Sequence, residues 1–133
     1  MNILVLEAST TSAKAMLYDT DTGKFDVKSR AYTGNYEDVT MHKADNVYEQ
    51  MIALGREVAA GHEISMISLS GTWHSLFLCD QDMKPVTPVY LWSYTGAAEV
   101  CKELREDPEY VKWFYNKTGC MVNAIYPFFK LLL

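Results

Sequence analysis

The 133-residue sequence has no excess of basic residues, and this absence limits its partners. Lys and Arg together number 12 against 17 Asp and Glu, which gives a formal net charge of -5 at pH 7. A protein that is held to nucleic acid by phosphate contacts normally presents a basic surface. The acidic balance therefore predicts that this chain does not bind nucleic acid.

Cysteine and long apolar runs are also scarce. The cysteines, Cys79, Cys101 and Cys120, are odd in number and form no Cys-x-x-Cys pair, which argues against a disulfide framework and a structural zinc site. No stretch approaches the ~20 apolar residues of a membrane span, and the first residues lack the basic region of a signal peptide. We expect reduced thiols in a cytoplasmic protein that has no membrane partner.

The composition is that of a globular domain, with 49% hydrophobic and 22% charged residues. Residues 2–6 form an uninterrupted apolar run, typical of a buried strand. Residues 13–18 and 24–32 follow clusters of turn residues and predict two more strands in an antiparallel meander. Apolar residues recur at helical spacing over residues 44–60, and Gly61 is a suitable helix stop.

The second half of the chain predicts further strands and helices. Apolar segments at residues 64–69, 75–79 and 89–92 indicate strands. Residues 95–105 predict a helix with Thr95 as its N-cap, and residues 108–118 predict another that starts on a proline and stops at a glycine. Because hairpins precede a helical crossover, the order predicts an α/β fold in which helices pack on a mixed sheet.

Several isolated residues receive structural assignments. His42 and His62 stand in polar, loop-like surroundings, which predicts surface positions. Met41, Met51 and Met66 are predicted to fill the core, because methionine adapts to irregular gaps.

The first candidate binding segment is the hydroxyl-rich turn between the first two predicted strands. Thr10, Thr11 and Ser12 offer hydroxyls and backbone N–H groups together, a set that suits phosphate oxygens, and Lys14 follows them. Glu7 ends the preceding strand, where its carboxylate is able to hold a metal ion beside phosphate. Ser and Thr are also common in purely structural hairpin turns, and composition leaves both interpretations open.

Two later segments combine aromatic and polar residues at predicted strand ends, where ligands meet an α/β sheet. Trp73 and His74 follow one strand; an aromatic ring covers the C–H face of a sugar and an imidazole bonds its hydroxyls. The alternative is that Trp73 belongs to the core and His74 to an ordinary turn. Tyr94 lies between another strand and a helix, where backbone N–H groups face the edge of the sheet.

These segments together resemble the N-terminal domain of the FGGY carbohydrate kinases, in particular the xylulokinase and gluconokinase type. Five motifs follow in the family's order: residues 4–19 are similar to its phosphate hairpin (usually Asp-x-Gly-Thr-Thr-Ser-x-Lys), residues 67–76 to its Ile-Ser-Gly-Gln-Met-His-Gly segment, residues 85–92 to its Pro-Leu-x-Pro-x-Ile-Leu-Trp strand, and residues 117–119 and 126–132 to its Thr-Gly and Lys-Leu-Leu signatures.

The resemblance implies a ribonuclease-H-like fold, shared with actin and hexokinase, and ATP-dependent phosphorylation of a sugar, polyol or sugar acid with Mg²⁺. It implies that residues 1–133 are the N-terminal part of the first domain and contain no catalytic residue. The catalytic Asp base and the nucleotide domain would lie in a missing C-terminal part, and the apolar run at residues 128–133 leads us to expect a fragment. The oligomeric state stays open, a homodimer included.

The chain departs from the family pattern at four positions. Glu7 replaces Asp and Ser9 replaces Gly in the hairpin, while Tyr94 and Gly96 replace the Asp and Arg of the usual Trp-x-Asp-x-Arg turn. In the family pattern this turn and the Trp73–His74 segment follow neighbouring strands, so the resemblance implies that Tyr94 lies close to Trp73 and His74. These departures keep a second hypothesis open, namely a degenerate kinase domain that binds without catalysis. A third, another ATPase of the same fold, is opposed by the segments around Trp73 and Trp92.

Overall fold

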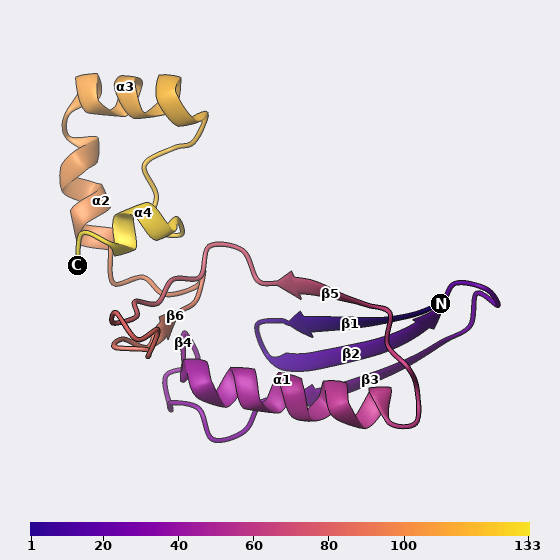
Figure 1. Ribbon diagram of the computed structural model, residues 1–133. Coiled ribbons are helices and arrows are strands. Elements are labelled where there is room, and N and C mark those ends of the chain that lie inside the picture. Colours follow the sequence, from indigo (N-terminus) through magenta and orange to yellow (C-terminus); the bar gives the residue numbers. More distant parts are fainter.

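The computed structural model describes residues 1–133, which form two lobes (Figure 1). The elements, in chain order, are β1 (Asn2–Ala8), β2 (Ser12–Asp19), β3 (Phe25–Ala31), β4 (Met41–His42), α1 (Ala44–Ala59), β5 (Met66–Gly71), β6 (Val89–Tyr90), α2 (Ala98–Arg105), α3 (Pro108–Thr118) and α4 (Pro127–Lys130). One lobe is a sheet covered by α1; the other consists of α2, α3 and α4.

The main sheet has the strand order β3-β2-β1-β5. The pairs β1–β2 and β2–β3 are antiparallel, which confirms the predicted meander. Strand β5 pairs with β1 in parallel, from Ile3 opposite Met66 to Ala8 opposite Gly71. Because parallel neighbours end at the same edge, the turn after β1 and the loop after β5 emerge side by side.

Helix α1 packs on one face of the sheet and makes the first hydrophobic core. The buried members alternate along β1 and β2 and recur at helical spacing on α1: Leu4, Leu6, Ala13, Ala15, Leu17, Leu54 and Val58. Gly55 allows the closest approach, since a methyl group there would lie 2.7 Å from Cδ2 of Leu6. The missing side chain on α1 is therefore what lets the helix lie on β1.

Polar contacts hold the outer strand β3 to the same helix. The carboxylate of Glu57 accepts hydrogen bonds from Lys28 Nζ at 2.9 Å and from Arg30 Nη2 at 2.7 Å. All three side chains are partly exposed, and a single exposed ion pair contributes less than about 1 kcal/mol. They therefore only supplement the backbone pairing with β2, which holds in place a strand that buries little apolar surface.

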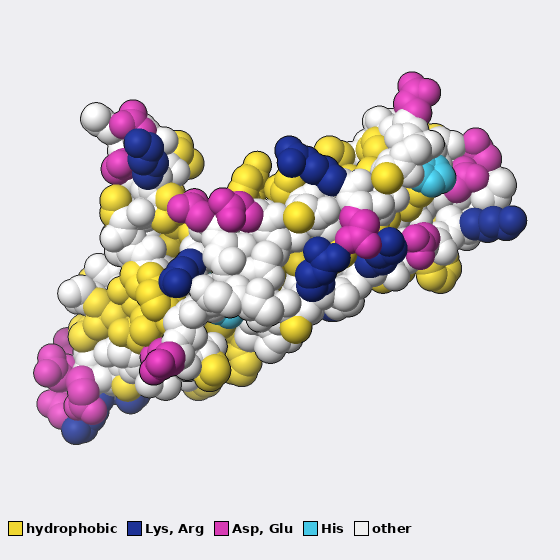
Figure 2. Space-filling view, turned by 90° about the horizontal axis from the view of Figure 1, so that it is seen from below, with side chains coloured by type: hydrophobic (Ala, Val, Ile, Leu, Met, Phe, Trp, Pro, Cys, Tyr) yellow, Lys and Arg dark blue, Asp and Glu magenta, His cyan; other side chains and the backbone are white.

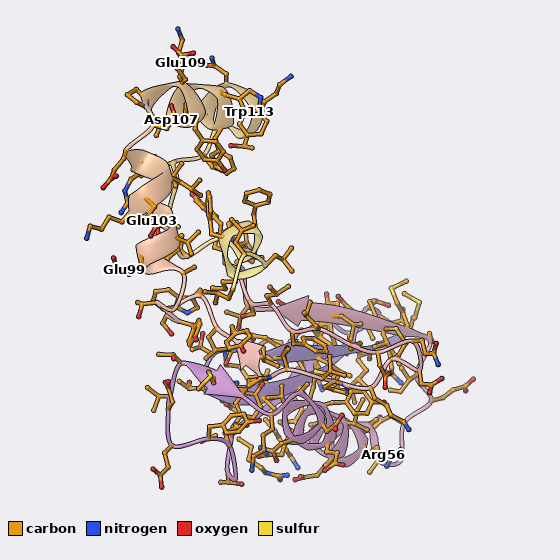
Figure 3. All side chains as sticks on the ribbon, turned by 90° about the vertical axis from the view of Figure 1, so that its left-hand side faces the viewer. Arg56, Glu99, Glu103, Asp107, Glu109 and Trp113 are labelled. Carbon is orange, nitrogen blue, oxygen red and sulfur yellow. The ribbon has the colours of Figure 1, made fainter.

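The helical lobe has its own core, made by Ala97, Cys101, Phe114, Val122 and Phe129. Helix α3 begins as predicted: the carboxylate of Asp107 accepts hydrogen bonds from the backbone of Glu109 and Tyr110. It ends at Gly119, whose φ of 69° is the left-handed conformation that favours glycine. Figure 3 shows the lobe away from the sheet, with acidic residues along α2 and the start of α3.

Several predictions about local structure were wrong. Residues 75–79 form no strand: Leu76 and Cys79 make only single bridges, because the segment lies beside the two-residue strand β6 and no longer partner is present. Helix α2 begins at Ala98 with Ala97 at the N-cap position and no side-chain cap, so Thr95 is not its cap. The carbonyl of Thr95 accepts the Ala98 N–H in a turn before the helix.

The burial of two side chains was predicted wrongly: His42 was expected at the surface and is buried, and Met66 was expected in the core and is exposed. His42 is only 8% exposed, because β4 pairs with β6 and the His42 ring packs edge-on against Tyr32. Met66 is 52% exposed, because β5 is an edge strand that α1 does not cover. The local sequence gives the hydropathy of the neighbours of His42 and Met66, but it does not show which distant elements cover these side chains.

Charged side chains of both signs are interspersed on the face that carries α1. Figure 2 shows Lys and Arg beside Asp and Glu along this face, without a continuous basic surface. None of the helices combines the length and the hydropathy that a membrane crossing requires.

We predict that Gly55→Ala destabilises the chain by about 1–3 kcal/mol, because the added methyl meets the buried Leu6 side chain. Helix propensity alone would give the opposite sign, a gain of about 1 kcal/mol. Urea unfolding followed by circular dichroism measures the change. Ala53→Gly, at an exposed position of α1, is the control and should lose about 1 kcal/mol. A stabilised Gly55→Ala would contradict the close packing.

We also predict an acid-sensitive contribution from Glu57. Hydrogen bonds from Lys28 and then Arg30 lower the pKa of its carboxyl. A carboxyl whose pKa is lower in the folded state stabilises the fold above the unfolded pKa, and loses this effect as pH falls through the folded pKa. Between about pH 7 and about pH 3, Glu57→Gln should therefore lose less thermal stability than the wild type. Glu49→Gln, on the same helix without an ion pair, should behave like the wild type.

Candidate functional site

The turn between β1 and β2 is the predicted hydroxyl-rich hairpin. Its ends are joined by the Ser9 backbone N–H and the Ser9 hydroxyl, which both donate to the Ser12 carbonyl at 3.0 and 2.8 Å. Thr10 and Thr11 therefore occupy the tip. The indole N–H of Trp92 donates to Oγ1 of Thr10 at 3.3 Å. Accepting this bond does not use the Thr10 hydroxyl hydrogen, which can still donate to a ligand oxygen.

Glu7 and Lys14 face each other across the hairpin. They are register partners in β1 and β2, and Lys14 Nζ lies 3.2 Å from both carboxylate oxygens of Glu7. Leu6 and Ala13 point to α1, so this ion pair lies on the opposite face of the sheet. Both side chains are partly exposed, which leaves the pair open to ligands from solvent.

Tyr32 is a polar residue of the site that sequence reasoning missed. It follows β3, and its backbone N–H donates to the Thr11 carbonyl at 3.0 Å. Its hydroxyl is buried without a hydrogen-bond partner, and burial together with the charge of Glu7 raises its pKa to about 12. Tyr32, Thr10 and Thr11 line a hollow of about 370 Å³ that also reaches His42. A tyrosine at a strand end gives no distinctive sequence signal.

The loop after β5 carries the predicted sugar-type residues. The hydroxyl of Thr72 donates to the carbonyl of Ala8 at 3.1 Å, which fixes the loop to the end of β1. Trp73 is 80% exposed and therefore does not belong to the core. His74 adopts a φ of 61°, and its ring lies edge-on to Tyr126 with centroids 5.0 Å apart. Tyr126 is a second residue that sequence reasoning did not assign to the site.

The ring of Tyr94 makes no aromatic contact with Trp73 or His74, and its expected place near them stays a prediction. Its ring packs on Tyr90, with centroids 4.6 Å apart, and covers the α-carbon of Gly96. A methyl group on Gly96 would lie 2.6 Å from Cζ of Tyr94, so this ring position requires glycine. Tyr94 and Gly96, two of the four departures from the family pattern, thus form one local arrangement. The Tyr94 ring occupies the space that a side chain at position 96 would need.

A hollow of about 260 Å³ opens at the carboxyl ends of β1 and β5. Its walls come from both strand ends, from the start of α1 and from the segments around β6: Ala8, Ser9, His42, Ala44, Val47, Tyr48, Met51, Gly71, Thr72, Ser75, Phe77, Val89 and Leu91. Most of these side chains are apolar, and the Ser75 hydroxyl is buried there without a partner.

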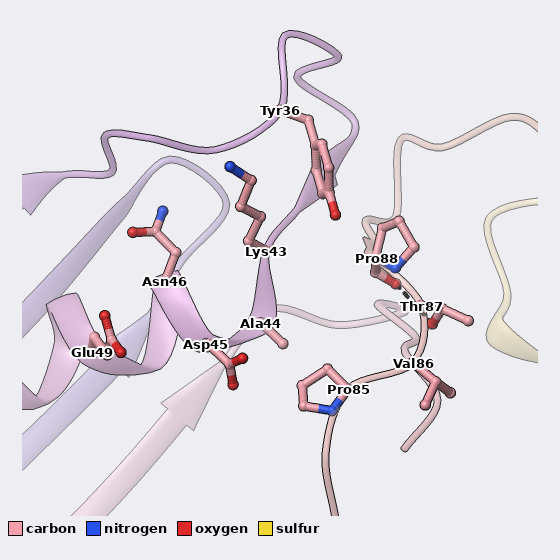
Figure 4. A pocket seen from close by; sticks show the side chains of 10 residues that line it. All are labelled: Tyr36, Lys43, Ala44, Asp45, Asn46, Glu49, Pro85, Val86, Thr87 and Pro88. Atoms are coloured by element: carbon pink, nitrogen blue, oxygen red, sulfur yellow. Dashed lines mark hydrogen bonds between the residues drawn. The ribbon is translucent and has the colours of Figure 1, made fainter. Parts of the chain in front are cut away.

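A larger and more open hollow of about 470 Å³ lies beside the start of α1 (Figure 4). Tyr36 and Lys43 form one side, with the Lys43 ammonium 5.5 Å from the ring centre, and the segment Pro85–Pro88 forms the other. None of the predicted site residues lines this hollow. The candidate site is therefore the edge formed by the hairpin tip and the loop after β5.

A mixed sheet with helices packed on it makes this an α/β domain, as predicted. The sequence profile described as "FGGY family of carbohydrate kinases, N-terminal domain" matches residues 2–132. The chain therefore belongs to the FGGY family of carbohydrate kinases and matches its N-terminal domain.

Relatives and solved structures agree with this assignment. Glycerol kinase of Clostridium botulinum (strain Eklund 17B / Type B) is 23% identical over 132 residues, covering 93% of this chain and 26% of the relative. The structure of ligand-bound xylulose kinase from Lactobacillus acidophilus has a TM-score of 0.86 at 21% identity, over 98% of this chain and 27% of that one. Plasmodium falciparum glycerol kinase with ADP has a TM-score of 0.85 at 20% identity, with 98% and 28% covered. The chain spans about a quarter of the length of these proteins.

We predict that Gly96→Ala forces the Tyr94 ring off Tyr90, because the methyl and the ring would occupy the same space. Loss of the nuclear Overhauser contacts between the two tyrosine rings reports the movement. A double-mutant cycle with Tyr94→Ala isolates the effect. Without the ring, Gly96→Ala should be neutral in thermal unfolding, whereas in the wild-type background it should destabilise. Equal effects in both backgrounds would contradict the arrangement.

Proposed function

We propose that this chain is the N-terminal part of an ATP-dependent kinase that phosphorylates a hydroxyl of a sugar, polyol or sugar acid. The observation that carries the proposal is the meeting of two unlike sets of groups at one sheet edge. The hairpin tip bears hydroxyls, and the loop after β5 bears an exposed ring and an imidazole. The Thr72–Ala8 bond of 3.1 Å ties the loop after β5 to the end of β1, and the Trp92–Thr10 bond of 3.3 Å ties the turn after β6 to the hairpin tip.

The hairpin is suited to phosphate. The hydroxyls of Thr10, Thr11 and Ser12 and the backbone N–H groups of the tip donate to phosphate oxygens, which binds and orients ATP. Lys14 adds a positive charge next to them. Glu7 fits Mg²⁺, because that ion takes one or two carboxylates together with phosphates and waters. When bound, Mg²⁺ would neutralise charge on the phosphates.

The loop after β5 is suited to a polyhydroxylated acceptor. The exposed Trp73 ring offers a face for sugar C–H groups, and the His74 ring nitrogens bond hydroxyls. Tyr126 supports the imidazole edge-on from the other lobe. These groups bind and orient the acceptor; the base that takes its proton is proposed to lie outside residues 1–133, as the family resemblance implies.

The remainder of the proposed enzyme belongs to a longer protein. Relatives are about four times as long as the matched region, which supports a second, nucleotide-binding domain as the partner of this one. Residues 1–133 alone would then turn over no sugar, because phosphoryl transfer needs a positioned base and clamps on the γ-phosphate. The three free cysteines suit the cytoplasm, where thiols stay reduced.

A second candidate function is a sugar-kinase-like domain that binds a ligand without catalysis. The arrangement of Tyr94 over Gly96 favours it, because the usual carboxylate and cation of this turn are both absent. Turnover separates the two functions. The protein from the complete open reading frame is incubated with ATP, Mg²⁺ and a panel of sugars, polyols and sugar acids, and ADP is measured. Acceptor-dependent ADP supports the kinase, whereas binding by calorimetry without ADP supports the second function.

We predict that Thr11→Val in the active protein raises the KM for ATP at least fivefold and changes the KM for the acceptor less than twofold. The reason is that the substitution removes one donor to phosphate, and a hydrogen bond to a charged group contributes about 1.5–3 kcal/mol. Thr20→Val, in the turn between β2 and β3, is the control and should change neither constant. A larger change in the acceptor constant would overturn the assignment of the hairpin.

A further inference from the structure

Lys130 is a buried cation whose partners are all backbone carbonyls. It is 3% exposed at the end of α4, and its Nζ donates to Leu91 at 2.6 Å, to His74 at 2.9 Å and to Ile125 at 3.2 Å. An ammonium has three hydrogens, so every donor is used. No carboxylate lies within ion-pair distance.

Each of the three carbonyls is next to a residue of the candidate site. His74 carries its own imidazole. Leu91 precedes Trp92, whose indole holds the Thr10 hydroxyl. Ile125 precedes Tyr126, whose ring supports His74. One ammonium therefore connects the loop after β5, the turn after β6 and the segment before α4.

The cation is not needed to fill space. The core of the helical lobe consists of other residues, and an apolar side chain of similar shape would avoid the cost of removing an ammonium from water. Burial indeed lowers the pKa of Lys130, which reflects that cost. What an apolar residue cannot do is orient three converging carbonyls, one of which belongs to a residue with a positive φ. The buried ammonium therefore contributes the orientation of these carbonyls and not a net gain in stability.

We propose that Lys130 is a positioning residue, whose ammonium holds His74 and Trp92 in the relative arrangement that binds the acceptor and the hairpin. Its role in turnover rests on the proposed kinase function, but its role in positioning does not. The two are tested separately, the first with the complete protein and the second with the 133-residue chain.

The positioning is tested by nuclear magnetic resonance on the 133-residue chain. Lys130→Met should shift the Trp92 indole N–H and the His74 ring signals and leave the amides of β1, β2 and α1 unchanged. Lys112→Met, at an exposed position of α3, is the matched control and should shift neither. Unchanged Trp92 and His74 signals in folded Lys130→Met would overturn the proposal. If Lys130→Met does not fold, the Lys130 ammonium signal of the wild-type chain is measured instead. Slow hydrogen exchange with couplings to the His74 and Leu91 carbonyls supports the proposal, whereas free exchange with solvent overturns it.

Rescue by a small cation separates positioning from simple loss of packing. Lys130→Ala removes the atoms of a propylammonium ion, so added propylammonium should return the Trp92 and His74 signals towards wild type. 1-Propanol, which fills similar space without charge, should not. Equal rescue by both compounds would show that packing alone matters and would overturn the proposal.

Kinetics of the complete protein give the second readout. Lys130→Met should raise the acceptor KM at least tenfold and lower kcat less than threefold, and propylammonium should restore the acceptor KM of Lys130→Ala. An unchanged acceptor KM would overturn the positioning role in the enzyme. If the wild-type complete protein forms no ADP with any acceptor, the proposed kinase function fails, and the resonance experiments alone decide the role of Lys130.

Discussion

The parallel pairing of β1 with β5 is the contact on which the candidate site depends. It brings residues that are more than sixty positions apart in sequence to one edge, with Ala8 opposite Gly71. The Thr72 hydroxyl then bonds the Ala8 carbonyl and fixes the loop after β5 beside the hairpin tip. Without this register, the hydroxyls of Thr10 and Thr11 and the rings of Trp73 and His74 would belong to separate surfaces.

The pairing itself rests on α1, because a parallel strand needs a crossover that packs on the sheet. Leu54 and Val58 bury the apolar side of that crossover against β1 and β2, and Gly55 lets the backbone come close enough to do so. The same helix leaves β5 uncovered at the edge. The sheet is thus well packed at β1 and β2, which form the hairpin, and sparsely packed at the edge strand β5.

The two lobes have separate hydrophobic cores, and their connection is largely polar and aromatic. Lys130 reaches from α4 to the carbonyls of His74 and Leu91, and Tyr126 meets the His74 ring. Such contacts are directional, unlike apolar packing, so they set an orientation as well as a distance.

The sequence by itself determined most of the longer local elements and the family. Apolar runs bounded by turn residues predicted β1, β2, β3 and β5, helical spacing predicted α1, and a starting proline with a stopping glycine predicted α3. These signals all lie within or next to each segment. Motifs in a fixed order predicted the family, which the match over residues 2–132 confirmed. The roles of the site residues in binding stay predictions. Only the tertiary structure decided that His42 is buried, that Tyr94 turns onto Tyr90 and Gly96, and that Lys130 joins three segments. Each of these depends on residues from distant segments, and a contact between distant segments leaves no periodic signal in the sequence around either partner.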